Sequence, residues 1–457
     1  MIKDKELLRK VMYIAVPIAL QNLISSSVNF ADVFMIGKLG ESSLAAVGLS
    51  NQISFLLNLL LFGITSGAGV MTAQYWGKKD VINIKKVLGL ALIFSLICST
   101  MFFLASFFMP EKLLKIYTPD LEVISLGVKY LKIVCFSYLI WAVSFVYVLQ
   151  LRGIAITKIT VISSFISLIV NIFLNYILIF GKFGFRAYGV EGAAIATCIA
   201  RLVEFFVIIV AVYIRKYPLA AKFKELINFD INFVKNYLKI SLPVVLNETI
   251  WSLGINCYSM IYARMSTEAV ATVNVVSSIE RIVFVGFIGL ANSAGVIIGN
   301  TIGEGENKKA EKYGVSFEKM AFILGIVMAI VMALITIPIL NVYELKEKTY
   351  NMAKITLFIL AFILPLKSIN STIIVGILRG GGDTKFALYI DVAALWLVSV
   401  PLVYFGGLVW GLPVYLVYLL AASEEIIKLI FGFRLVEMIL IYNQKRNFTN
   451  ILIMEQI

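Results

Sequence analysis

Residues 17–37, PIALQNLISSSVNFADVFMIG, form an apolar segment of helix length that carries a carboxylate, Asp32, in its interior. The polar side chains of the segment recur at steps of three and four residues, so in a helix they share one face: Asn22, Ser25, Ser26, Asn29 and Asp32. An ionisable side chain at membrane depth is costly unless it faces a cavity or a partner. The segment therefore predicts a membrane helix whose polar face lines a functional site.

The same segment returns in the second half of the chain. The identities at a shift of 226 residues include Pro17 with Pro243, Gly63 with Gly289, and residues 68–70 with 294–296. A Leu-Arg-Gly motif at 151–153 returns at 378–380, a shift of 227. Coincident glycines and a shared motif are not expected from apolar composition alone, so we infer an internal duplication. The copies differ at Asp32, which falls on Tyr258.

The composition is that of a polytopic membrane protein. Of 457 residues, 60% are hydrophobic and 15% are charged, and the mean hydropathy is +0.94. Apolar runs of about 20 residues, enough to cross about 30 Å of hydrocarbon, recur six times in each half. We place them at 11–36, 44–72, 87–109, 126–150, 159–181, 190–214, 237–262, 269–300, 316–340, 353–377, 386–406 and 410–434.

An even number of spans in each half means that both copies enter the membrane in the same direction, as parallel repeats related by a pseudo-two-fold axis along the membrane normal. The sequence thus predicts an all-α membrane protein with twelve transmembrane helices in two six-helix lobes. The expected boundaries are 1–214 for the N-lobe, 215–236 for a cytoplasmic linker, 237–440 for the C-lobe and 441–457 for a cytoplasmic tail.

The distribution of charge predicts the topology. The net charge is +13, and the lysines and arginines collect in alternate loops. This is the positive-inside bias, and it places both termini in the cytoplasm. This distribution argues against a nucleic-acid partner. The four cysteines lie within predicted spans without metal-like or paired spacing, and the polar N-terminus predicts no cleavable signal.

A candidate ion site combines Asp32 with polar residues of the fifth span. Ser164, Ser167, Asn171 and Asn175 share one face there. We expect Asn171 and Asn175 to line the cavity around Asp32, together with Tyr138 in the fourth span and Thr197 in the sixth. Such an all-oxygen site suits a hard cation, with Asp32 and Asn175 as Na⁺ ligands. The alternative is that the amides only bond neighbouring helices.

The chain has no histidine, so any proton relay must use carboxylates. Desolvation favours the neutral form of a carboxyl group, and a bound sodium ion favours its ionised form. Competition of a proton, a cation and a cationic substrate for Asp32 would be a coupling mechanism, because each ligand stabilises the conformation that binds it better.

A second group of residues is expected to line a substrate cleft between the two bundles: Gln21, Asn22, Asn29, Glu248, Ser252 and Asp391. Other charged residues within the spans have spacings that fit local ion pairs, namely Arg201 with Glu204 and Glu424 with Lys428. Glu280 and Arg281 are expected to neutralise charges nearby.

Enzyme motifs are absent. The chain has no GxxxxGK[ST] phosphate loop, no HExxH and no GxSxG. We therefore expect no ATP hydrolysis, no enzyme activity and no cofactor. The glycines of LRGGGDTK, residues 378–385, are expected to form a short cytoplasmic turn.

Several stretches together resemble the multidrug and toxic compound extrusion (MATE) family over nearly the whole chain. They are PIALQNLISSSVNFADVFMIGKLGESSLAAVGL, GAGVMTAQYWGKKD, LRGIAITK, NIFLNYILIFG with GVEGAAIAT, LPVVLNETIWSLG, IGEGENKKA and LRGGGDTK. The resemblance implies twelve helices in two lobes around a central V-shaped cleft, and export of cationic, amphipathic drugs in exchange for Na⁺ or H⁺.

The resemblance also implies roles for single residues. Asp32 resembles the first-helix carboxylate of the family's N-lobe cation site, and Asn171 the amide of that site in the fifth helix. Asn175 stands where archaeal-type relatives carry an aspartate, so this chain departs from their pattern. Glu248 lies on the helix that carries a cleft glutamate in other members, and Asp383 resembles an acidic residue after the tenth helix.

The expected function is that of a bacterial inner-membrane antiporter for drugs and toxic organic cations, with Asp32 as the coupling carboxylate. We expect it to act as a monomer among membrane lipids. One alternative is a flippase for lipid-linked saccharides, which should show a strongly cationic cleft. Another is a non-transporting membrane scaffold or sensor, which would not need Asp32.

Overall fold

A computed structural model describes residues 5–343 and 345–432, and all regular elements in this part of the chain are helical. Ten of these helices are long and apolar enough to cross a membrane. The predicted tail, 441–457, and the last residues of the predicted twelfth span, 433 and 434, lie outside the described residues. An all-α membrane protein was predicted, and the described residues bear this out.

The chain divides into two compact units. One is Met12–Glu248, here the N-terminal unit; the other combines Met1–Val11 with Thr249–Ile457, here the C-terminal unit. Both boundaries fall inside long helices: α1 (Lys5–Gly37) passes from the C-terminal to the N-terminal unit at Val11, and α10 (Ile231–Met265) passes the opposite way at Glu248.

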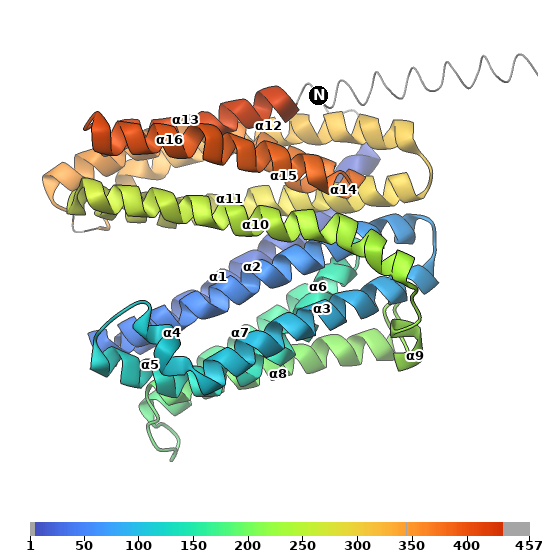
Figure 1. Ribbon diagram of the computed structural model, residues 1–457, viewed down its shortest axis with the longest axis horizontal. Coiled ribbons are helices and arrows are strands. Elements are labelled where there is room, and N and C mark those ends of the chain that lie inside the picture. Colours follow the sequence, from blue (N-terminus) through green and yellow to red (C-terminus); the bar gives the residue numbers. More distant parts are fainter. Residues whose placement is uncertain (1–4, 344, 433–457) are drawn as a thin grey trace, which may run out of the picture. The chain divides into compact units, whose positions relative to one another are not determined.

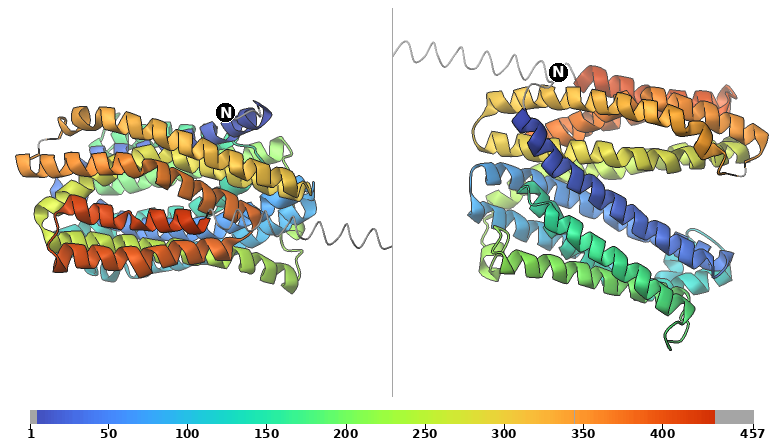
Figure 2. Two further views of the ribbon diagram at one scale, coloured as in Figure 1. Left: turned by 90° about the horizontal axis from the view of Figure 1, so that it is seen from above. Right: turned by 180° about the vertical axis from the view of Figure 1, so that it is seen from behind.

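The N-terminal unit contains most of α1, the first half of α10 and eight helices between them (Figures 1 and 2). These eight are α2 (Glu41–Gly77), α3 (Val81–Phe108), α4 (Pro110–Lys115), α5 (Leu121–Val134), α6 (Phe136–Gly153), α7 (Lys158–Phe180), α8 (Val190–Ile214) and α9 (Phe223–Leu226). The predicted fourth span, 126–150, is thus two helices that meet at Cys135.

The C-terminal unit contains three helices whose continuations are π-helical turns. Its elements are α11 (Thr267–Gly303), α12 (Asn307–Leu340), α13 (Glu347–Ser371), η1 (Thr372–Leu378), α14 (Arg379–Gly381), α15 (Thr384–Ala393), η2 (Ala394–Ser399), α16 (Val400–Tyr404), η3 (Phe405–Val409) and α17 (Val414–Ala421), with residues 423–432 also helical. Turns of this type occur frequently at functional sites.

The element bounds and the packing both reflect the duplication. Helices α2 and α11 begin and end at the same shift of 226 residues. In each unit the glycine of Leu-Arg-Gly packs on a repeated glycine: a Cβ on Gly153 would lie 3.3 Å from the Gly69 carbonyl oxygen, and one on Gly380 would lie 2.7 Å from the Gly295 Cα. The motif is therefore a close helix contact, of the kind that small residues permit between membrane helices.

Aspartate and serine caps set several helix starts. The side chains of Asp80, Asp120, Ser266 and Asp383 accept hydrogen bonds from backbone N–H groups at the starts of α3, α5, α11 and α15. Asp120 satisfies two of the donors that a helix start leaves unpaired, and each of the others satisfies one. Asp383, which resembles an acidic residue of the family, is thus a helix cap.

Candidate functional site

The candidate ion site lies between α1 and α7, which run side by side in the N-terminal unit (Figure 2). The Asn175 amide nitrogen donates to Asp32 Oδ1 at 2.5 Å and to Asn171 Oδ1 at 3.1 Å. Asn171 and Asn175 are buried, and Asp32 is half-buried. The structure thus brings together the three residues at the centre of the predicted site.

A positive charge on a neighbouring helix acts on this group. The charge of Arg201, on α8, acts on Asp32. Its guanidinium donates to Ser137 Oγ at 2.7 Å and packs over the Trp141 ring, 4.4 Å from the centroid. The predicted pair of Arg201 with Glu204 forms no salt bridge within the described residues, because Arg201 turns to α6 and Glu204 turns to α7; the charge of Arg201 still acts on Glu204.

Two further residues were predicted to join the site, Tyr138 and Thr197. The Tyr138 hydroxyl pairs with Ser54 Oγ on α2 at 3.0 Å. Thr197 is half-buried on α8. In the part of the chain that the structure describes, no hydrogen bond joins either residue to Asp32.

Gln21 lies in a buried hydrogen-bond chain, here the Gln21 clasp, formed by Arg152, Gln21, Ser164 and Glu204. Arg152 Nη2 donates to Gln21 Oε1 at 2.7 Å, Gln21 Nε2 donates to Ser164 Oγ at 3.1 Å, and Ser164 Oγ donates to Glu204 Oε1 at 2.8 Å. Gln21 is 5% exposed and Arg152 8%. The clasp joins α1, α6, α7 and α8 and connects a buried cation to a carboxylate through two neutral side chains.

The other predicted cleft residues have varied surroundings. Asn29 is exposed, Asn22 and Glu248 are half-buried, and Ser252 is buried. Asp391, in the C-terminal unit, forms a buried ion pair.

The partner of Asp391 is Lys428, whose Nζ lies 2.6 Å from Asp391 Oδ1 and 3.2 Å from Glu424 Oε2. The predicted pair of Glu424 with Lys428 is therefore confirmed. Glu280 pairs with Lys367 and accepts a hydrogen bond from the Tyr418 hydroxyl at 3.1 Å, so its charge is neutralised by another helix, as expected.

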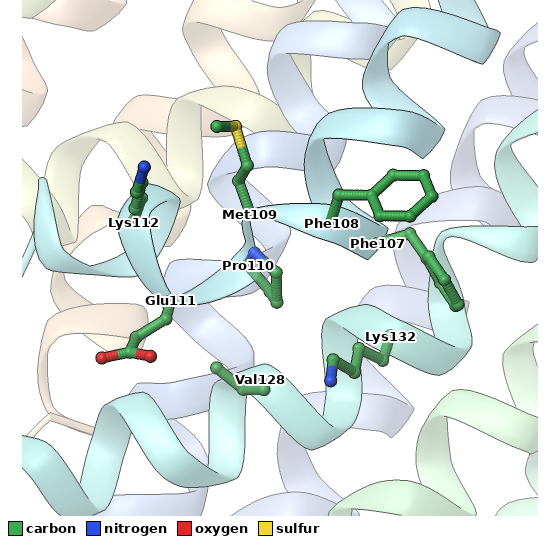
Figure 3. Close-up of a pocket in the computed structure, with 8 residues that line it drawn as sticks. All are labelled: Phe107, Phe108, Met109, Pro110, Glu111, Lys112, Val128 and Lys132. Atoms are coloured by element: carbon green, nitrogen blue, oxygen red, sulfur yellow. The ribbon is translucent and has the colours of Figure 1, made fainter.

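A pocket of about 510 Å³ opens where α3, α4 and α5 meet (Figure 3). Its lining combines apolar side chains with three charged residues: Phe107, Phe108, Met109, Pro110, Glu111, Lys112, Val128 and Lys132. None of the predicted site residues lines it, so it does not coincide with the candidate ion site.

The predicted linker lies within the N-terminal unit and contacts α3 through Glu225 on α9. Lys85 Nζ, on α3, lies 2.8 Å from Glu225 Oε1. The other carboxylate oxygen accepts from the Lys222 backbone N–H at 2.6 Å. The hydrogen bond from Lys85 is the main reason why the pKa of Glu225 is lowered from its ordinary value.

Asp32, Asn171 and Asn175 together offer a site for a single monovalent cation or proton. Asn175 Oδ1 is buried, and among the described residues no donor bonds to it. Within residues 5–343 and 345–432, no three Cys, Asp or Glu side chains gather in a way that could hold a metal ion. Tight divalent sites use several carboxylates, so a single carboxylate beside amide oxygens favours a proton or a monovalent cation.

Sequence reasoning did not identify the Gln21 clasp. The contacts of Gln21 are with residues 131 and 143 positions away. One signal was available: Arg152 belongs to the repeated Leu-Arg-Gly motif, and an arginine between apolar residues needs an acceptor.

Comparison with known proteins gives a consistent result. The MatE family model matches this chain twice, over residues 17–177 and 243–405, which follows the internal duplication. The chain is 26% identical over 400 residues to the probable multidrug resistance protein YoeA of Bacillus subtilis, covering 87% of this chain and 86% of that protein. It is 28% identical over 419 residues to the probable multidrug resistance protein NorM of Pasteurella multocida, with coverage of 87% and 85%.

Solved structures share the fold. A crystal structure of MATE in the bent conformation superposes with a TM-score of 0.88 at 20% identity, covering 96% of this chain and 97% of that chain. An outward-facing multidrug resistance MATE family transporter of the MOP superfamily superposes with a TM-score of 0.85 at 20% identity, covering 94% and 95%. Twelve helices in two lobes, as predicted, are the architecture of these proteins.

Proposed function

Because this chain belongs to the MatE family of multidrug efflux transporters, we propose that it is a secondary antiporter that exports small, cationic, amphipathic organic compounds in exchange for Na⁺ or H⁺. Asp32 is the coupling carboxylate. One observation carries this assignment: the Asp32 carboxylate contacts the Asn175 amide, whose own oxygen is buried without a donor. The names of the multidrug resistance relatives support the substrate class.

The coupling ion binds where this amide oxygen and the carboxylate meet. Protonation of Asp32 places a donor beside oxygens that lack one, and Na⁺ is coordinated by the same oxygens. Either ion neutralises Asp32 and changes its bond to Asn175, which connects α1 to α7. Since an ion can shift a conformational equilibrium only through its different affinity for the two states, this interhelical bond is the element through which binding acts.

The proposed setting is the bacterial cytoplasmic membrane, with both termini in the cytoplasm, according to the positive-inside distribution of charge. The transporter acts as a monomer. Its arginines near the candidate site have partners in the N-terminal unit, since Arg152 bonds Gln21 and Arg201 bonds Ser137. This engagement favours an organic cation over the pyrophosphate of a lipid-linked saccharide as substrate.

Transport of ethidium by inverted vesicles, in which export from the cytoplasm is measured as uptake into the lumen, tests the proposal. The native chain and Asp32→Asn are driven in turn by a Na⁺ gradient and by a pH gradient, with insertion checked by protease protection. We expect efflux by the native chain with one of the two gradients, and none by the variant. Gradient-driven efflux by an inserted Asp32→Asn variant would exclude Asp32 as the coupling residue. Absence of organic-cation efflux by the native chain under both gradients would favour the flippase.

A further inference from the structure

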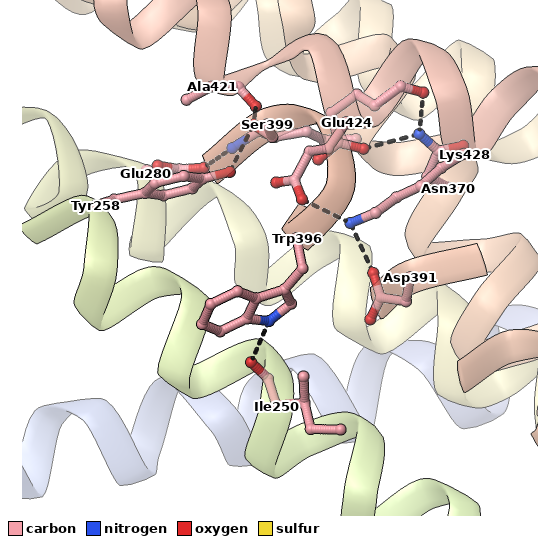
Figure 4. Close-up of polar contacts among 12 residues, drawn as sticks. Ile250, Tyr258, Glu280, Asn370, Asp391, Trp396, Ser399, Ala421, Glu424 and Lys428 are labelled. Carbon is pink, nitrogen blue, oxygen red and sulfur yellow. Dashed lines mark hydrogen bonds and ion pairs between the residues drawn. The ribbon is translucent and has the colours of Figure 1, made fainter. Parts of the chain in front are cut away.

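The C-terminal unit holds a buried group of charges that the proposed function does not use (Figure 4). We call Asn370, Asp391, Glu424, Glu425 and Lys428 the Lys428 cluster. Lys428 is paired with Asp391 and Glu424. The Asn370 amide nitrogen donates to the Glu425 backbone oxygen and to Glu425 Oε2, both at 2.7 Å. All five residues are buried, with Lys428 at 5% and Asn370 at 2% exposure.

The charges of this region do not balance. Three carboxyl groups act on the single ammonium of Lys428. Lys367, whose charge also acts on Glu424, is already paired with Glu280. Together, four carboxyl groups face two ammonium groups. A buried carboxylate without a countercharge is so costly that such a group neutralises instead.

The hydrogen bonding leaves a place for a donor. Asn370 Oδ1 is buried, and among the described residues it has no hydrogen-bond partner; Glu424 Oε2, also buried, has only the ion pair with Lys428, at 3.2 Å, in this part of the chain. An amide and a carboxylic acid can pair reciprocally, because the amide N–H donates to one carboxyl oxygen while the acid O–H donates to the amide oxygen. The donation from Asn370 to Glu425 supplies half of such a pair.

Other polar groups frame the cluster from neighbouring helices. Glu280 on α11, Lys367 on α13 and the phenols of Tyr258, Tyr262 and Tyr418 interact electrostatically with one another or with Glu424. The Tyr258 hydroxyl donates to Ser399 Oγ at 2.5 Å, and Ser399 Oγ donates to the Ala421 oxygen at 2.7 Å. Tyr258 stands at the repeat position of Asp32.

The helices that carry the cluster change geometry beside it. The π-helical turn η1 begins two residues after Asn370, and η2 begins three residues after Asp391 and ends at Ser399. Because π-helical turns are frequent at functional sites, they mark this part of the C-terminal unit independently of its charges.

We propose that the Lys428 cluster binds one exchangeable proton, shared among its carboxyl groups beside the Asn370 amide. The proton converts one carboxylate to a carboxylic acid and supplies the donor that the Asn370 amide oxygen lacks. If the protein is the antiporter proposed above, the cluster is a second proton-carrying site of the transporter, separate from Asp32; this statement rests on the proposed function. A proton fits better than a metal ion, since no three acidic side chains of the described residues are arranged to hold a metal.

Infrared spectroscopy of the full-length protein in lipid nanodiscs tests the proposal without any transport. In neutral buffer exposed carboxyl groups are ionised, so a carboxylic-acid carbonyl band that shifts in D₂O reports a buried, exchangeable proton. All samples carry Asp32→Asn, which removes the proton of the proposed coupling site. We expect the band in this background and its weakening when Glu424→Gln and Glu425→Gln are added, because two carboxyl groups then face two ammonium groups.

A matched control is Glu111→Gln, an exposed carboxylate of the N-terminal unit, which should leave the band unchanged. A band that persists undiminished in the double variant would overturn the proposal. If the double variant does not fold, the single variants Glu424→Gln and Glu425→Gln are expected to weaken the band, and an undiminished band in both would equally overturn it. Suppression of the band by Na⁺ but not by choline would show a cation site and contradict the proton assignment. Absence of ethidium transport by the native chain would instead count against the proposed function alone, because the infrared experiment does not depend on transport.

Discussion

Replacement of Gln21 by methionine should destabilise the N-terminal unit. Methionine has a similar length and volume, so the packing is kept, but both hydrogen bonds of the Gln21 side chain are lost. The bond from Arg152 involves a charged group and contributes about 1.5–3 kcal/mol, and the bond to Ser164 contributes about 1 kcal/mol. Arg152 Nε already has no partner among the described residues, so the variant removes the acceptor from a second nitrogen of this buried guanidinium. We expect a loss of about 3 kcal/mol.

Reversible unfolding in bicelles measures this loss. Gln21→Glu keeps an acceptor for Arg152 and adds a countercharge, so it should retain most of the stability. Ser27→Ala on the same helix is the control, because Ser27 is exposed and its hydroxyl donates only to the Leu23 carbonyl oxygen of its own helix. A loss for Gln21→Met no larger than that for Ser27→Ala would refute the role of the clasp, as would equal losses for Gln21→Met and Gln21→Glu.

Three further predictions concern the ion site and the linker. Asn175→Asp adds a second carboxylate beside Asp32, so Na⁺ should bind more tightly by about 1.4 kcal/mol. The midpoint of Na⁺-dependent thermal stabilisation should then lie at an Na⁺ concentration about tenfold lower. Gly89→Ala should displace α9, because the new Cβ would lie 1.8 Å from a backbone oxygen of that helix; hydrogen exchange of residues 215–230 should accelerate. A carboxyl group whose pKa is lowered by folding stabilises the folded state above its unfolded-state pKa, and this stabilisation is lost as the pH falls through the lowered pKa. The protection from hydrogen exchange given by the Lys85–Glu225 pair should therefore disappear in acidic buffer.

Each of these predictions has a control. For Asn175→Asp, an unchanged Na⁺ midpoint together with an unchanged pH dependence of efflux would contradict the site. Gly48→Ala on α2 is the matched glycine substitution, because its Cβ would meet nothing within 4 Å, and it should leave exchange in the linker unchanged. Glu225→Gln should remove the pH dependence of linker exchange; a pH dependence that survives in this variant would show that another group is responsible.

The fold could be predicted largely from the sequence. Span length and apolar composition identify membrane helices directly, because the thickness of the hydrocarbon fixes how many residues must be apolar. The internal repeat predicted that the chain consists of two similar halves, and the family match at 17–177 and 243–405 falls on the same two copies. Helical periodicity placed Asp32 on the polar face of its own helix and Asn171 with Asn175 on one face of another.

Partners across helices could not be predicted, because periodicity gives the face of a helix and not what that face meets. Gln21 was expected in the cleft and lies in a buried clasp. Arg201 was expected to pair within its own helix and bonds Ser137 instead. The π-helical turns of the C-terminal unit had no signal in the sequence, since an apolar run has the same composition with or without them.

Ion flux driven by substrate tests the central claim most directly, that Asp32 binds the coupling ion. Proteoliposomes with the native chain or Asp32→Asn receive an ethidium gradient, and ²²Na⁺ movement and internal pH are followed without any imposed ion gradient. The account predicts that the native chain moves one of the two ions against ethidium, and that Asp32→Asn moves neither while still binding ethidium. Equal ion flux in the native chain and the variant would contradict it.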